Sequence, residues 1–299
     1  MSIIQKYLLF VFFVSLLAFS CKSDKKTDTS SLEKALNVEL DTTSKVFRFE
    51  NSLFSIPSPY QLSILIKSMG SDYNSELINP SDNYKQYTSL FEKAINMGIY
   101  GADLAYLNIY QQSPAAITYF SVIKLLAQDL GLSAAIDPQI FKRIESNIDK
   151  QDSLLFIMSN TYRDVDFFLK ENQRQREGAL VLAGGWIEAM YFLTTLSLET
   201  KNAELIQRAG ENKQPLENLI KILQPYYNES EDMKNLVDDL IDLSYEFDAV
   251  ETNYQYKEPT TLPQQKLTKV HSVTETVVSD EVLTTINDKI THIRNLLIK

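Results

Sequence analysis

Two carboxylates in apolar surroundings are the residues of this chain best suited to acid–base chemistry. Glu188 is the only charged residue in the 21-residue stretch 178–198, and Asp103 lies in the small-residue segment 98–106. Burial raises the pKa of a carboxylic acid, so two such groups in one pocket could act as general acid and general base. The other side chains that would line this ligand pocket are Tyr100, Tyr106 and Trp186.

The same two carboxylates also have a purely structural interpretation. A buried carboxylate without a partner is destabilising, so Glu188 could be neutralised by a base or by a tyrosine hydroxyl. The bases considered for this role are Lys124, Arg174 and Arg176. Asp103 could be a favourable charge in the first turn of a helix. The sequence favours this structural interpretation and leaves an enzyme with two buried carboxylates as the alternative.

Other catalytic constellations are absent from the sequence. His271 and His292 are the only histidines, and neither occurs in a His-x-x-x-His or Glu-x-x-His spacing, so ordinary zinc and di-iron sites lack their ligands. No P-loop, dinucleotide fingerprint or nucleophile elbow is present. We therefore expect no metal and no cofactor, and a binding or scaffold module in preference to an enzyme.

The N-terminus has the pattern of an export signal. Lys6 is the only charge in the first 20 residues, residues 7–17 are apolar apart from Ser15, and Cys21 is the only cysteine in the chain. A basic start, an apolar core of about 11 residues and a small residue before the cut are typical of a signal peptide. A membrane-spanning helix needs about 20 apolar residues, so an uncleaved span is not expected here.

The Ser20-Cys21 junction resembles the lipobox of bacterial lipoproteins. The resemblance implies that residues 1–20 are removed and that Cys21 is lipidated and becomes the mature N-terminus. The sequence departs from the family pattern at Ala18, where Leu is usual, and at the bulky Phe19, which leaves plain secretion as the alternative. Residues 21–30 would then be the lipidated cysteine and a flexible tether, because 22–30 have nothing to bury.

Charge and composition limit the partners. The formal net charge is −10, and removal of residues 1–20 leaves 28 basic and 39 acidic residues, a net charge of −11. This balance argues against nucleic acid and against adhesion to an anionic membrane surface. The expected partners are therefore the membrane, through the N-terminal lipid, and an unidentified envelope protein or small ligand.

Helical periodicity runs through most of the chain after the tether. Glycine is scarce, with 8 residues, whereas 16 Tyr and 15 Phe supply long apolar side chains, a balance that favours helices. The predicted helices are 31–39, 59–69, 81–97, 100–112, 114–130, 138–149, 151–171, 175–200, 202–209, 214–224, 230–252 and 280–298. We predict an all-α, irregular multi-helix bundle that forms a single domain over residues 31–299.

The stretch 178–198 is predicted to be a helix enclosed by other helices, because both of its faces are apolar. Gly184 and Gly185 each cost roughly 1 kcal/mol relative to Ala within a helix, which is tolerable where another backbone approaches closely. A transmembrane span is the alternative for so apolar a stretch. The central Glu188, with neighbouring Thr and Ser residues, makes insertion into a bilayer costly.

Residues 253–278 break the helical pattern. Two prolines fall in its first half, and the second half is rich in Val and Thr, which favours an extended or β-like arm before the last helix. We expect this segment to be a linker that crosses the surface of the bundle.

A repeat architecture is the alternative to the irregular bundle. Residues 98–131 span 34 residues with two predicted helices, the length of a tetratricopeptide unit, but no second copy follows. A helical-repeat adaptor is therefore less favoured. The segment 98–106, together with Gly-Gly-Trp-Ile-Glu-Ala at 184–189, resembles a group of uncharacterised helical lipoproteins of Bacteroidota. That resemblance implies a helical fold and an outer-membrane location, on the periplasmic face or the cell surface, and no activity.

Overall fold

The computed structural model describes residues 46–49, 52–55, 58–133, 138–147 and 171–299, together with positions 150, 153, 157 and 168. Contacts divide the chain into residues 1–44 and residues 45–299, so everything described belongs to the second unit. The predicted signal peptide, Cys21, the tether and the helix 31–39 lie outside the described residues, as does most of the predicted helix 151–171.

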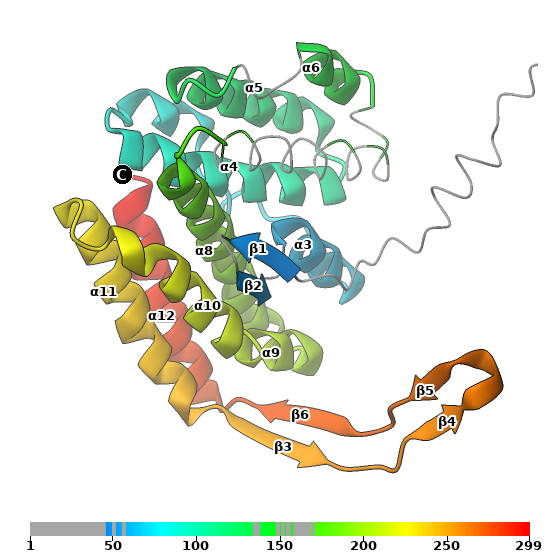
Figure 1. Ribbon diagram of the computed structural model, residues 1–299. Helices are drawn as coiled ribbons and strands as arrows, with labels where there is room; N and C mark the ends of the chain where they lie inside the picture. Colours follow the sequence, from blue (N-terminus) through cyan, green and yellow to red (C-terminus); the bar gives the residue numbers. More distant parts are fainter. Residues whose placement is uncertain are drawn as a thin grey trace, which may run out of the picture. The chain divides into compact units, whose positions relative to one another are not determined.

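The described part is mainly helical, which confirms the predicted all-α class (Figure 1). The helices are α3 (Pro59–Ser68), α4 (Leu90–Ile109), α5 (Ser113–Asp129), α6 (Pro138–Glu145), α8 (Gln175–Thr200), α9 (Ala203–Gly210), α10 (Lys213–Leu223), α11 (Glu231–Glu246) and α12 (Asp280–Leu297). Short 3-10 segments are η1 (Ser81–Gln86), η2 (Gln224–Tyr226), η3 (Phe247–Ala249) and η4 (Pro263–Gln265).

Serine caps fix the start of several helices. The Ser58 hydroxyl accepts a hydrogen bond from the Gln61 backbone N–H, and the Ser58 backbone N–H donates to the Gln61 side-chain oxygen. This capping box lies one residue before the proline of α3. Ser89 and Glu92 form the same motif at the start of α4. These side chains satisfy backbone N–H groups that have no partner inside the helix.

The prediction of separate helices at 81–97 and 100–112 was wrong. Residues 81–86 form η1, and α4 runs without a break through Gly98 and Gly101. Gly98 lies where α8 crosses α4: an added Cβ would be 2.8 Å from the Gly185 amide nitrogen and 2.9 Å from the Val181 carbonyl carbon. The glycine permits close approach of two helices and does not end one.

Helices α4 and α8 form the centre of the fold. A Cβ on Gly184 would lie 2.9 Å from the Ile95 carbonyl carbon, so the close backbone approach predicted for the glycines of α8 is confirmed. Helix α8 also contacts α3, α9, α10 and α12. A solenoid has contacts only between successive repeats, whereas these contacts join elements far apart in sequence, which favours the irregular bundle.

Helix α8 is enclosed, as predicted. Among the described residues it is the one helix long and apolar enough to cross a membrane, but 78% of its most apolar window is buried inside the protein. Its buried residues come from all sides of the helix, because Trp186, Glu188 and Phe192 are each at most 1% exposed. Such a helix serves as the core of the bundle.

Residues 251–277 form a β-hairpin, which we call the arm (Figure 1). β3 (Glu251–Gln255) pairs antiparallel with β6 (Val273–Val277), and β4 (Thr260–Leu262) with β5 (Leu267–Lys269). The predicted β-like arm is confirmed, but the expected linker across the bundle surface was wrong. The strands pair with one another, and almost every arm residue is exposed except Thr276 at the base, which lies beside Gly210 of α9.

A second small hairpin joins β1 (Val46–Phe49) to β2 (Ser52–Ser55).

Candidate functional site

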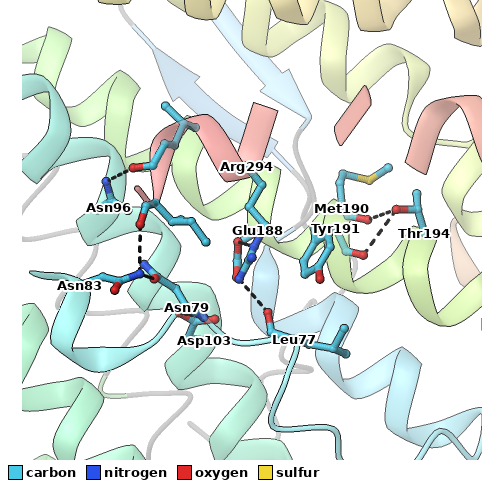
Figure 2. Close-up of polar contacts among 12 residues, drawn as sticks. Leu77, Asn79, Asn83, Asn96, Asp103, Glu188, Met190, Tyr191, Thr194 and Arg294 are labelled. Carbon is cyan, nitrogen blue, oxygen red and sulfur yellow. Dashed lines mark hydrogen bonds and ion pairs between the residues drawn. The ribbon is translucent and has the colours of Figure 1, made fainter. Parts of the chain in front are cut away.

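The two predicted carboxylates do come together, between α4 and α8. Asp103 and Glu188 are both 0% exposed, and the two carboxyl groups lie close enough for each to shift the pKa of the other. Arg294 of α12 donates from Nε to Glu188 Oε2 and from Nη2 to Glu188 Oε1, both at 2.7 Å (Figure 2). A bidentate arginine–carboxylate pair of this kind fixes the position of both side chains. We call Asp103, Glu188 and Arg294 the acid–arginine cluster.

The cluster needs one proton to be neutral, because it contains two carboxyl groups and one guanidinium. Burial raises the pKa of Asp103 well above its ordinary value, and the negative charge of Glu188 raises it further. Burial also raises the pKa of Glu188, although Arg294 favours its ionised form. Asp103 Oδ1 has no donor among the described residues, so a proton held there completes a hydrogen bond to Glu188.

Arg294 also has partners outside the acid pair. Its guanidinium lies 4.3 Å from the centre of the Tyr191 ring, within the range of a cation–π contact (Figure 2). Its Nη2 donates to the Leu77 carbonyl oxygen at 2.8 Å. Burial lowers the pKa of an arginine, but the two acids outweigh this effect and raise the pKa of Arg294. The arginine therefore stays charged and joins three separate parts of the chain.

The segment between α3 and η1, residues 71–80, is held by tyrosine hydroxyls from α4 and α5. These bonds are Tyr110 Oη to Ser71 O at 2.7 Å, Asn74 N to Tyr106 Oη at 3.0 Å, Tyr119 Oη to Asn79 O at 2.7 Å and Tyr100 Oη to Pro80 O at 2.9 Å. Asp103 Oδ2 accepts from the Asn79 backbone N–H at 3.3 Å. The protein's own loop 71–80 therefore occupies the tyrosine hydroxyls that were expected to meet a ligand.

Asparagine side chains join the end of α12 to α4 and η1. Asn96 Nδ2 donates to the Leu297 carbonyl at 2.8 Å, and Asn83 Nδ2 donates to the Ile298 carbonyl at 3.0 Å (Figure 2). The last carbonyls of a helix have no partner within it, so these amides satisfy them. The end of α12 is thus fixed by the same part of the protein that surrounds the acid–arginine cluster.

The predicted pocket residues all lie in the core. Tyr100 and Tyr106 are 0% exposed and bond to loop 71–80, and Trp186 is buried with no acceptor for its Nε1 among the described residues. The partners proposed for Glu188 were wrong in part, because Arg174 and Arg176 instead pair with Glu177 at the start of α8. Tyr100 and Tyr106 therefore bind a segment of the protein itself at the place where a ligand was predicted.

Sequence reasoning missed Arg294, although one signal for it was present. The apolar stripe of the last helix includes Ile286 and Ile290, and a further step of four residues reaches Arg294. A basic residue on the core-facing stripe of a helix requires a buried acid as its partner. Arg294 is therefore the base on a core-facing stripe that the buried Glu188 requires.

The described residues offer no evident metal centre. Within them, no group of three or more His, Cys, Asp or Glu side chains is arranged to hold an ion. The acid–arginine cluster has two carboxyl groups, but the guanidinium already occupies both oxygens of Glu188. The site can store a proton and hold helices together, and a cation would have to displace Arg294.

Comparisons with known proteins returned no relative. A scan against protein-family models found no matching family, and searches of curated proteins and of solved structures found no match.

Proposed function

We propose that the protein is a lipid-anchored cell-envelope protein whose helical domain acts as a binding or scaffold module. The observation that supports this most is the closure of the acid–arginine cluster. A general acid or base must reach its substrate, whereas Asp103 and Glu188 are 0% exposed, Glu188 is bonded to Arg294 and Asp103 is bonded to loop 71–80. The alternative of an enzyme that uses these two carboxylates is therefore not favoured.

The exposed part of the molecule supports a binding role. The arm carries side chains such as Tyr256 and Val270, which are 69% and 72% exposed. Clusters of exposed apolar side chains mark interaction sites more often than they mark ordinary surface. A module of this kind would use its core for rigidity and its arm for contact.

The anchor proposal places the protein at the outer membrane, on its periplasmic face or at the cell surface, and Cys21 tests it. Wild-type protein should incorporate a palmitate analogue, and Cys21→Ala should be unlabelled and accumulate as the unprocessed precursor. Labelling of the variant would contradict the proposal. A wild-type protein that is cleaved but unlabelled would support plain secretion instead.

Site-specific photo-crosslinking in the producing cell tests the binding role. A photoreactive residue at Val270 on the arm should give a discrete adduct in the envelope fraction. The matched control is Leu125 on α5, an exposed apolar residue on a helix at 42% exposure. No adduct at Val270, or the same adducts from both positions, would argue against the arm as the contact element.

A further inference from the structure

The arm exposes apolar side chains that nothing in the described part of the protein covers. Half of the large apolar side chains exposed in that part lie in the arm: Tyr254, Tyr256, Leu267, Val270, Val273 and Val277. A two-stranded ribbon is marginally stable in water, and three or more strands are normally needed for stability. The arm therefore has the composition expected of a surface whose apolar side chains are covered by another molecule.

One side of β3 is open to a further strand. Among the described strands, β3 has β6 as its only neighbour. Proteins usually protect such an edge with proline or lysine, but residues 251–255, Glu-Thr-Asn-Tyr-Gln, contain neither. An unprotected edge can accept a strand from another chain through backbone hydrogen bonds.

We propose that the arm is a dimerisation element, in which β3 pairs antiparallel with β3 of a second copy and makes a four-stranded sheet. The sequence around Tyr254 is self-complementary for this pairing. With Tyr254 on the two-fold axis, Glu251 lies opposite Lys257 of the second copy, and Thr252 lies opposite Tyr256. Opposite charges, and an aromatic side chain facing a β-branched one, stabilise a sheet when they lie directly across two strands, and the symmetry makes each of these pairs twice.

Charge along the arm supports the same pairing. The tip, residues 256–272, has three lysines and one glutamate in a chain whose net charge is −10. The base, residues 246–252 and 274–281, has six acidic residues and no Lys or Arg; Glu246, Asp248 and Asp280 pair with lysines of the bundle, which leaves Glu251, Glu275 and Glu281 without an ion pair among the described residues. In the antiparallel arrangement the tip of each arm extends beyond β3 towards the base of the other arm, so each basic tip approaches an acidic base. This dimer does not depend on lipid at Cys21.

Charge reversal tests the register. The mass of the full chain in detergent solution is measured by light scattering over a range of concentrations. Lys257→Glu puts two acids opposite each other on both sides of the axis and should raise the dimer dissociation constant about tenfold. Glu251→Lys should do the same, and the double reversal should restore the wild-type value. Lys234→Glu, an exposed position on α11, is the control for the change in net charge.

Cysteine crosslinking tests the axis. Directly opposed residues in an antiparallel pair have Cα atoms about 4.5–5.5 Å apart, which a disulfide can bridge. Tyr254→Cys should therefore give a covalent dimer under oxidation. Asn253→Cys should not, because it would lie opposite Gln255 and not its own copy. The unmodified chain controls for Cys21.

Several results would overturn the proposal. They are a full chain that stays monomeric at all soluble concentrations, a dimer that is insensitive to Lys257→Glu, a double reversal that fails to restore dimerisation, and equal crosslinking from positions 253 and 254.

Anionic lipid is the other partner that a basic tip would bind. A monomeric chain that floats with phosphatidylglycerol vesicles, and loses this on Lys257→Glu, would show that lipid and not a second copy is the partner. Far-UV circular dichroism verifies that each variant keeps its helices.

Discussion

Gly98→Ala tests whether direct backbone contact between α4 and α8 holds the core together. The added methyl would lie 2.8 Å from the Gly185 nitrogen and 2.9 Å from the Val181 carbonyl carbon, and closer still to the Val181 carbonyl oxygen. All three are main-chain atoms of a helix, so none can rotate away as a side chain would. Ordinary carbon contacts are about 3.5–4.0 Å, so the two helices must separate by roughly 1 Å.

The expected cost follows from this separation. Extra atoms in a packed core cost about 1–3 kcal/mol, and the upper end applies where the neighbours are rigid. We expect Gly98→Ala to lower the free energy of unfolding by about 3 kcal/mol, which is about 6–12 °C in Tm for a domain of this size. Gly101→Ala is the matched control on the same helix, because its Cβ would have nothing within 4 Å. It should gain about 0.5–1 kcal/mol from helix propensity.

Urea unfolding followed by circular dichroism and by tryptophan fluorescence provides the assay. Trp186 is the only tryptophan in the chain and is 1% exposed on α8, directly after Gly185, so its emission reports on the crossing itself. Gly98→Ala should lower the urea midpoint, and Gly101→Ala should raise it. Equal effects, or a Gly98→Ala protein as stable as wild type, would refute the argument that backbone contact at this crossing excludes a side chain.

Three further substitutions test the polar contacts of the core. Burial raises the pKa of folded Asp103 above the value of about 3.9 that an unfolded chain has. The folded protein therefore keeps a proton that the unfolded chain loses. As a result, the free energy of unfolding falls as pH rises from about 4 towards the folded pKa. Asp103→Asn, whose amide still donates to Glu188, should show a smaller fall in urea midpoints measured across this range, and an unchanged slope would contradict this. Arg294→Met leaves a buried acid pair without its cation and should cost about 3–5 kcal/mol in the same assay, whereas a neutral result would mean that the pair is dispensable. Tyr119→Phe should cost about 1 kcal/mol and speed hydrogen exchange in loop 71–80, while Tyr245→Phe on an exposed residue should change neither; equal effects would remove the tyrosine from the loop's support.

Local signals in the sequence predicted most of the helices. The Ser58-Pro59 start and the apolar stripes need only residues a few positions apart, so they are visible in the chain itself. The same is true of Gly184, whose cost within a helix implied a close backbone neighbour. The break expected in α4 was wrong because Gly98 serves a contact with a helix more than 80 residues later, which no local pattern encodes.

In the candidate site, too, local signals were visible in the sequence and contacts between distant residues were not. Burial of Glu188 was evident from its apolar surroundings, but its partner Arg294 is 106 positions away in sequence. Tyr100 and Tyr106 of α4 were predicted to line a pocket, but the sequence could not show that loop 71–80, and not a ligand, binds their hydroxyls. The Val and Thr content of the arm indicated an extended backbone. It could not show whether the extended segments pair with each other or cross the surface of the helices.

The position of Arg294 in the last helix has a consequence for the order of folding. A chain is made from its N-terminus, so Asp103 and Glu188 exist long before their cation does. Until residue 294 has been synthesised, the two acids lack a counter-charge and the Leu77 carbonyl lacks its arginine donor. Nascent or truncated chains that stop before α12 are thus left with an open centre accessible to proteases. Closure of the core around the two acids therefore requires α12, which supplies their only bonded cation among the described residues.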